Sequence, residues 1–154
     1  MRKIINIVVP VVICFLVGWT ASMFQAHSLT EWYPQLNKPA LTPPNLVFPL
    51  AWTILYICMG VSAGLVLNSN SPRKKGLIWL FAIQLFFNFT WSLFFFYLRS
   101  PLFALVNILI LLALIIWYTC QSFKVNIASS ILFFPYILWA CFATYLNAYI
   151  FWYN

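Results

Sequence analysis

Residues 101–121 read PLFALVNILILLALIIWYTCQ and contain no charged side chain. A helix of about 20 apolar residues is long enough to cross the hydrocarbon core of a bilayer, so this stretch predicts a transmembrane helix. Further apolar runs of similar length occupy residues 4–24, 46–67, 77–98 and 126–151. We therefore expect an all-α membrane protein in which residues 1–154 form a single domain, a bundle of five transmembrane helices.

The composition excludes other classes of protein. Of the 154 residues, 65% are hydrophobic and 6% are charged, whereas a soluble domain carries roughly 25% charged residues. Such a chain cannot cover a water-facing surface, which excludes a soluble enzyme and a disordered protein. The strands of a transmembrane β-barrel alternate polar and apolar residues, and the continuous apolar runs disfavour that fold.

The first apolar run has two interpretations. It follows Arg2 and Lys3, as the apolar part of a cleaved signal peptide would. The length of the run and the poor cleavage sequence Phe24-Gln25-Ala26 favour a retained helix.

Residues 25–45 predict a stiff, non-helical loop. Its prolines are Pro34, Pro39, Pro43 and Pro44. Each of them lacks a backbone donor and disfavours helix before it. Loops of this length are often lids or binding loops.

The basic residues are distributed unevenly across the predicted membrane. One side carries Arg2, Lys3, Arg73, Lys74, Lys75 and Lys124, and the other carries Lys38 and Arg99. The positive-inside rule then places the N-terminus in the cytoplasm, with the proline-rich loop and the C-terminus outside. Because these residues lie at the ends of apolar runs, the net charge of +7 does not indicate binding to nucleic acid.

Few residues are suited to ion coupling or metal binding. Glu31 is the only acid and His27 the only histidine, and both are expected in the proline-rich loop rather than in a span. Proton-coupled transporters usually carry such groups inside the membrane, so that class is disfavoured. The cysteines Cys14, Cys58, Cys120 and Cys141 lie singly in apolar runs and predict neither a metal site nor a disulfide framework.

Aromatic and polar residues recur at helical spacing on three of the predicted helices. The stripes are Trp52, Tyr56, Met59 and Ala63; Gln84, Asn88, Trp91 and Phe95; and Trp139, Ala143, Leu146 and Ile150 with Asn147 at the edge. Polar amides are costly against lipid, so the stripes should face the bundle interior. The pattern fits a pocket for a flat, apolar ligand and equally fits helix packing with interhelical amide bonds.

Small residues indicate close helix contacts. Gly60 and Gly64 form a GxxxG motif, and Cys14, Gly18 and Ser22 form a row on the first helix. Such rows permit close approach within one chain or between two copies in a homodimer, and the pattern leaves both open.

Several segments resemble a known family. The residues concerned are Trp32 to Pro39 and Pro43-Pro44, Phe48 with Trp52 to Tyr56, Asn88 to Ser92 with Phe94 to Phe96, and Pro135-Tyr136, Trp139, Phe142-Ala143 and Leu146-Asn147. Together they resemble the translocator protein family, also called tryptophan-rich sensory proteins or peripheral-type benzodiazepine receptors. The resemblance covers almost the whole chain, with five helices in matching order.

This resemblance implies a bundle that binds protoporphyrin IX or other tetrapyrroles, with the proline-rich loop as a lid over the pocket. It also implies synthetic benzodiazepine-site ligands and a homodimer in the lipid bilayer. Bacterial members are associated with light-dependent oxidative breakdown of the porphyrin, which uses light and oxygen and requires no cofactor.

Carried over by position, the resemblance implies a set of ligand-binding residues. They are Tyr33, Trp52, Tyr56, Asn88, Trp91, Trp139, Ala143 and Leu146. Trp52 and Trp139 are the candidates for the photochemical, catalytic step, because indole is among the side chains that are easiest to oxidise.

The resemblance to animal members is incomplete. These carry a proposed cholesterol motif in which a basic residue follows a tyrosine at the end of the fifth helix, whereas no basic residue follows Tyr153 here. We therefore expect a bacterial-type member in the cell membrane and do not expect sterol as the natural ligand.

Three functions remain open at this point. The protein promotes photo-oxidative degradation of porphyrin, or binds porphyrin as a sensor without turnover, or transports porphyrin or sterol. An indole-lined pocket serves the first two equally well, and the lack of intramembrane acids argues against a proton-coupled form of the third.

Overall fold

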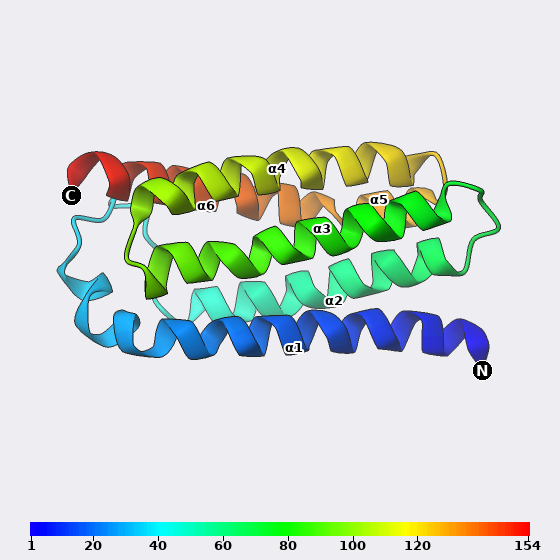
Figure 1. The fold of residues 1–154 in the computed structure, drawn as a ribbon, viewed down its shortest axis with the longest axis horizontal. Helices are drawn as coiled ribbons and strands as arrows, with labels where there is room; N and C mark the ends of the chain where they lie inside the picture. Colours follow the sequence, from blue (N-terminus) through cyan, green and yellow to red (C-terminus); the bar gives the residue numbers. More distant parts are fainter.

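The computed structural model describes all 154 residues as a bundle of antiparallel helices (Figure 1). The main helices are α1 (Arg2–Glu31), α2 (Val47–Leu67), α3 (Lys74–Ser92), α4 (Pro101–Phe123) and α6 (Phe134–Tyr153). The short elements are η1 (Tyr33–Gln35), the π-helical η2 (Leu93–Tyr97) that continues α3, and α5 (Ile127–Ile131). Five segments are long and apolar enough to cross a membrane, which confirms the predicted five-span, all-α fold.

The first helix is longer than predicted. It continues to Glu31 instead of ending near residue 24, because residues 25–31 contain no glycine or proline. His27 and Glu31 therefore lie on the last turns of a helix and not in a loop, which corrects their expected placement. Only residues 36–46 connect η1 to α2 without helix.

The last predicted helix is divided in two. Asn126 begins α5 by accepting a hydrogen bond from the Ser129 amide at 3.1 Å, as helix-capping residues do. The helix then stops at Ile131 and resumes as α6, with Pro135 in its first turn. Proline is suited to the first turn of a helix, because a backbone N–H at that position has no carbonyl partner within the helix and its absence costs no hydrogen bond.

Glycines allow α1 and α2 to touch through their backbones. A Cβ atom added to Gly64 would lie 2.6 Å from Cα of Ile7, and one added to Gly60 would lie 2.6 Å from the backbone nitrogen of Val11. The GxxxG motif thus serves a contact within one chain. Its glycine face is covered by α1 and is not available to a second copy.

Polar side chains join the helices inside the bundle. The Ser62 hydroxyl of α2 lies 3.2 Å from the Tyr118 hydroxyl of α4 and 2.7 Å from the Ser129 hydroxyl of α5. Asn107 of α4 donates to the Phe87 carbonyl of α3 at 2.8 Å. Such bonds satisfy groups that lipid cannot, and they hold α2, α3, α4 and α5 in register.

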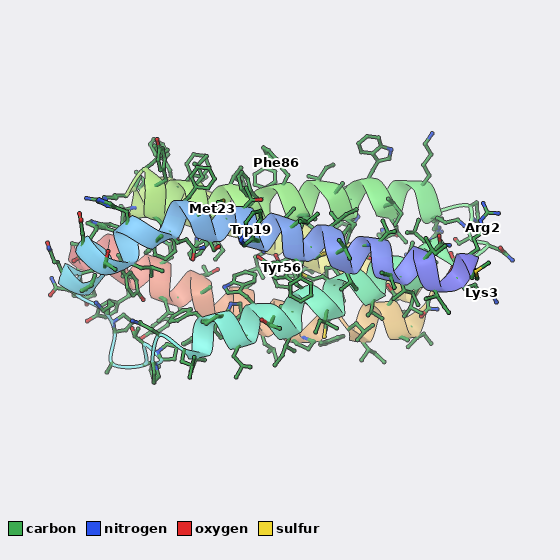
Figure 2. All side chains as sticks on the ribbon, turned by 90° about the horizontal axis from the view of Figure 1, so that it is seen from below. Arg2, Lys3, Trp19, Met23, Tyr56 and Phe86 are labelled. Atoms are coloured by element: carbon green, nitrogen blue, oxygen red, sulfur yellow. The ribbon has the colours of Figure 1, made fainter.

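The two ends of the bundle differ in charge. Figure 1 shows the N-terminus at the same end as the α2–α3 and α4–α5 connections, and the C-terminus at the opposite end. Arg2 and Lys3 lie at the start of α1 (Figure 2), at the end that also carries Arg73 to Lys75 and Lys124. Between the ends, the outward side chains are apolar, such as Trp19, Met23 and Phe86, each more than half exposed (Figure 2).

Candidate functional site

Three indoles from different helices meet around a small cavity inside the bundle. Its lining consists of Trp52, Asn88, Trp91, Ile108, Leu111, Tyr136, Trp139, Ala140 and Ala143, from α2, α3, α4 and α6. The free space is about 10 Å³, which is roughly the room for one water molecule. The side chains therefore fill most of the space that they surround.

Aromatic contacts close the cavity between α2 and α6. The Trp52 ring packs edge-on against Trp139 and Tyr136, with ring centroids 6.4 Å and 6.2 Å away. Phe48, one turn before Trp52, packs edge-on against Trp139 at 5.9 Å. We call this set the aromatic seam: Phe48 and Trp52 of α2 with Tyr136 and Trp139 of α6. Trp52 and Trp139 are each partly exposed, so the seam reaches the surface of the bundle.

Tyr56 supports Trp52 from behind. Its ring stacks on the Trp52 ring at 5.5 Å and 28°. The same ring occupies the notch left by Gly18 of α1, where an added Cβ would lie 2.7 Å from Cζ of Tyr56. Figure 2 shows Tyr56 between α1 and α2. Gly18 thus gives the Tyr56 ring a place outside the cavity.

The amides at the cavity are held by hydrogen bonds. Asn88 accepts from the Tyr56 hydroxyl at 3.3 Å and donates to the Tyr136 hydroxyl at 2.7 Å. The Trp91 indole N–H donates to Asn147 at 3.0 Å, and Asn147 donates to the Pro101 carbonyl at 2.8 Å. These bonds tie α3 to α2 and α6, and α6 to the start of α4, around the cavity.

The structure brings together five of the eight residues implied for the ligand site. Trp52, Asn88, Trp91, Trp139 and Ala143 line the cavity. Tyr56 and Leu146 are buried but outside the lining. Tyr33 is also buried, in a separate aromatic group with Phe95 and Phe96.

The remaining lining residues were not selected from the sequence. Ile108 and Leu111 belong to α4, in which Asn107 is the only polar residue between Pro101 and Ile116. The amide of Asn107, which is buried and bonds to α3, was the available signal for the inward face of α4, because Ile108 adjoins it and Leu111 lies one turn further along the helix. Tyr136 and Ala140 lie three to seven residues before Ala143 on α6, and this helical spacing would have found them.

The proline-rich segment lies against the C-terminal end of the bundle. Asn37 makes three hydrogen bonds to the end of α6. Its backbone N–H donates to the Asn154 side chain at 2.8 Å, its side-chain amide donates to the Tyr153 carbonyl at 3.0 Å, and its carbonyl accepts from the Asn154 side-chain amide at 3.2 Å. Lys38 donates to the Tyr33 carbonyl at 2.7 Å, with its ammonium 4.8 Å from the centre of the Tyr33 ring. Burial raises the pKa of the Tyr33 hydroxyl above its ordinary value.

An open hollow of about 540 Å³ lies over this segment. Its lining residues are Tyr33, Pro34, Lys38, Pro39, Thr42, Pro43, Pro44 and Asn45. This hollow shares no lining residue with the cavity between the indoles.

Comparison with known proteins places the chain in a family. The TspO/MBR family model matches residues 10–153. The chain belongs to the TspO/MBR family. Family membership and the five spans together make it an integral membrane protein.

Relatives in this family come from several branches of life. The chain is 36% identical to the tryptophan-rich protein TspO of Chlorobaculum tepidum over 149 residues, which cover 95% of this chain and 94% of the relative. It is 36% identical to the tryptophan-rich sensory protein of Cereibacter sphaeroides over 117 residues, 75% of this chain and 73% of the relative. It is 32% identical to the human translocator protein over 120 residues, 76% of this chain and 71% of the relative.

Proposed function

We propose that this TspO/MBR protein binds tetrapyrroles, protoporphyrin IX among them, in the cavity between α2, α3, α4 and α6, and promotes their light-dependent oxidative degradation. The observation that carries the proposal is the convergence of Trp52, Trp91 and Trp139 on one intramembrane space. Indole rings offer flat apolar faces, on which a flat macrocycle stacks favourably.

Binding requires the cavity to widen. The present free space of about 10 Å³ is far below the ~300–1,000 Å³ of ordinary ligand pockets. We expect the cavity to widen at the aromatic seam, because its rings touch only edge-on and its side chains can rotate without a change in the backbone. Ala140 and Ala143 add room, since neither fills the space beside the Trp139 indole.

The indole side chains of the site are also suited to photochemistry. A porphyrin excited by light can accept an electron from Trp52 or Trp139, react with O₂ and return the electron to the indole radical, so that O₂ is the only net oxidant. Addition of one O₂ molecule across a bridging carbon–carbon double bond, followed by cleavage of the O–O and C–C bonds, leaves two carbonyl groups and opens the ring. This route needs light and oxygen and requires no cofactor.

The surroundings of the site follow from the same proposal. Residues 36–46 act as a lid near the C-terminal end of the bundle. The protein lies in the cell membrane, and its N-terminus with the nearby basic residues is on the cytoplasmic side. Synthetic benzodiazepine-site ligands are further occupants of the cavity. The protein is a homodimer through a surface other than the glycine face, which α1 covers.

A second function is binding without turnover, as a porphyrin sensor or carrier. The hydrogen bonds of Asn88 and Trp91 favour it, because both side chains are already engaged in tying the helices together. Groups committed in this way hold the shape of a binding site, which is all that binding without turnover requires. The name of the Cereibacter sphaeroides relative, a sensory protein, is in line with this alternative.

One experiment separates the two functions. Purified protein is mixed with protoporphyrin IX, and absorbance is followed under light and in the dark for wild type, Trp52→Phe, Trp139→Phe and the control Trp79→Phe. Trp79 is 64% exposed on α3 and does not line the cavity. We expect wild type and Trp79→Phe to give the same defined product, with slower conversion in the other two variants although they still bind.

Equal bleaching in every protein and in detergent alone would leave only the sensor or carrier function. Absence of saturable binding by wild type would remove both.

A further inference from the structure

Gln84 of α3 is an exception among the buried polar groups. Its side chain is fully buried, and neither Oε1 nor Nε2 has a hydrogen-bond partner. No other buried side chain in the protein has an unpartnered nitrogen or oxygen. An amide held without partners away from water destabilises the folded protein, so its presence inside a membrane-spanning helix calls for a function.

The other buried amides show how unusual this is. Asn88, Asn107 and Asn147 each use both their oxygen and their nitrogen in hydrogen bonds to neighbouring helices. Gln84 lies one turn from Asn88 on the same face of α3. Packing between helices therefore accounts for the three asparagines and leaves the glutamine unexplained.

Gln84 lies one helical turn beyond the cavity residue Asn88 on α3. Asn107 of α4 is bonded to the Phe87 carbonyl of α3, and the two helices run antiparallel (Figure 1). One turn further along α4 is Leu111, and one turn back along α3 is Gln84, so these two residues lie at the same level. Leu111 lines the cavity and Gln84 does not. A cavity that lengthens by one helical turn beyond Asn88 reaches the Gln84 amide.

We propose that the Gln84 carboxamide is a ligand-binding group of this site and pairs with a neutral donor–acceptor edge of the bound molecule. The proposal rests on tetrapyrrole binding in the cavity. A carboxamide offers one acceptor and two donors, which match an edge that carries both a carbonyl oxygen and an N–H or O–H. A protonated carboxylic acid and a lactam both present such an edge.

The charge of the site selects the neutral form. No lysine, arginine or histidine lines the cavity, and a carboxylate there would be an unpaired charge in an apolar environment. Gln84 thereby recognises either the acid arm of a porphyrin or the lactam end of an opened tetrapyrrole.

The test measures equilibrium binding of three probes to detergent-solubilised wild type and Gln84→Met. Methionine keeps the length of the side chain and removes the amide. Octaethylporphyrin carries no acid or lactam, protoporphyrin IX carries acid arms, and biliverdin dimethyl ester carries lactam ends with its acids blocked. The control variant is Gln121→Met on α4, outside the cavity lining.

We expect Gln84→Met to weaken binding of protoporphyrin IX or of biliverdin dimethyl ester about ten-fold, as loss of hydrogen bonds to the ligand implies. Which of the two is affected identifies the source of the edge. Octaethylporphyrin should bind within about two-fold of wild type, and Gln121→Met should change none of the three. The unliganded variant should melt at the same temperature as wild type or higher, because no bond within the protein is lost.

Equal weakening for all three probes, or for none, overturns the proposal, since Gln84 would then act through packing or through a bound water. Failure of wild type to bind any probe overturns the proposed function as well. If Gln84→Met does not fold, Gln84→Asn, which withdraws the amide by one methylene, is measured with the same probes. Unchanged affinities in that variant overturn the proposal.

Discussion

The two sides of α2 are built in opposite ways. On one side, Gly60 and Gly64 bring its backbone against the backbone of α1, with no space for even one added carbon. On the other side, Phe48 and Trp52 meet α6 through the edges of large rings, around a cavity. A backbone contact has no side chain that can rearrange, whereas a contact between ring edges changes when a side chain rotates.

This difference assigns separate tasks to the two interfaces. The α1–α2 contact fixes α2 in the bundle, and the aromatic seam allows the space between α2 and α6 to change. Asn88 of α3 limits how far α2 and α6 can separate, because it is hydrogen-bonded to Tyr56 of α2 and to Tyr136 of α6 at the same time.

The largest effect is expected at the glycine interface. Gly60→Ala places a carbon against the Val11 backbone, so α1 and α2 must separate along their length. We expect a loss of about 3 kcal/mol in the free energy of unfolding, measured by denaturant titration in detergent micelles. Gly76→Ala is the control, because nothing lies within 4 Å of an added Cβ there. Alanine at that helical position should slightly stabilise the protein, and equal effects of the two variants would contradict the assignment.

A smaller effect is expected where Asn88 bridges the two tyrosines. Asn88→Leu leaves the buried hydroxyls of Tyr56 and Tyr136 without their partner and should cost about 2 kcal/mol of folding free energy. A double-mutant cycle with Tyr136→Phe measures the bond directly. Removing the Tyr136 hydroxyl should matter in wild type and have almost no effect in Asn88→Leu, whereas additive effects would show that the two side chains are not coupled.

The smallest effect is expected at the loop. Asn37→Ala removes the side-chain bond from the proline-rich segment to the Tyr153 carbonyl at the end of α6. An exposed hydrogen bond contributes about 0.5 kcal/mol, so loss of this bond should speed protoporphyrin IX association about two- to three-fold, measured by stopped-flow fluorescence. Asn45→Ala, in the same segment but without a bond to α6, is the control. If association were unchanged or slower, the segment would not act as a lid.

The sequence was sufficient for the number and order of spans and for much of the cavity. Length and continuous hydrophobicity determine a membrane-spanning helix, and the polar amides and indoles that must avoid lipid reveal the inward faces of α2, α3 and α6. On α4, Ile108 and Leu111 are aliphatic like the residues that face lipid, so their residue type alone does not distinguish them, and only the neighbouring amide Asn107 marks the inward face.

Other features depend on contacts between distant segments. The first helix extends through polar residues to Glu31, beyond the hydrophobic run that predicted its end. There His27 lies between Glu31, at 3.2 Å, and Arg99 of the α3–α4 connection, at 3.2 Å. Tyr33 lies just after the end of α1 and packs against Phe95 and Phe96 of η2. No local sequence pattern predicted that η2 is a π-helical segment. The use of the GxxxG motif within one chain likewise depends on how closely α1 approaches α2.

The most direct test of the account is to fill the cavity from α6. Ala143→Phe places a ring beside Trp139, in the space proposed for the ligand, and Cys141→Phe places the same ring on an exposed position of the same helix. Protoporphyrin IX binding is then titrated by absorbance for both variants and wild type, with melting temperatures measured in parallel. We predict that Ala143→Phe weakens binding more than about ten-fold in a protein that still folds, with a lowered melting temperature because the free space of about 10 Å³ is too small for a ring, while Cys141→Phe binds like wild type. Wild-type affinity in a folded Ala143→Phe protein would contradict the claim that the ligand lies between α2 and α6.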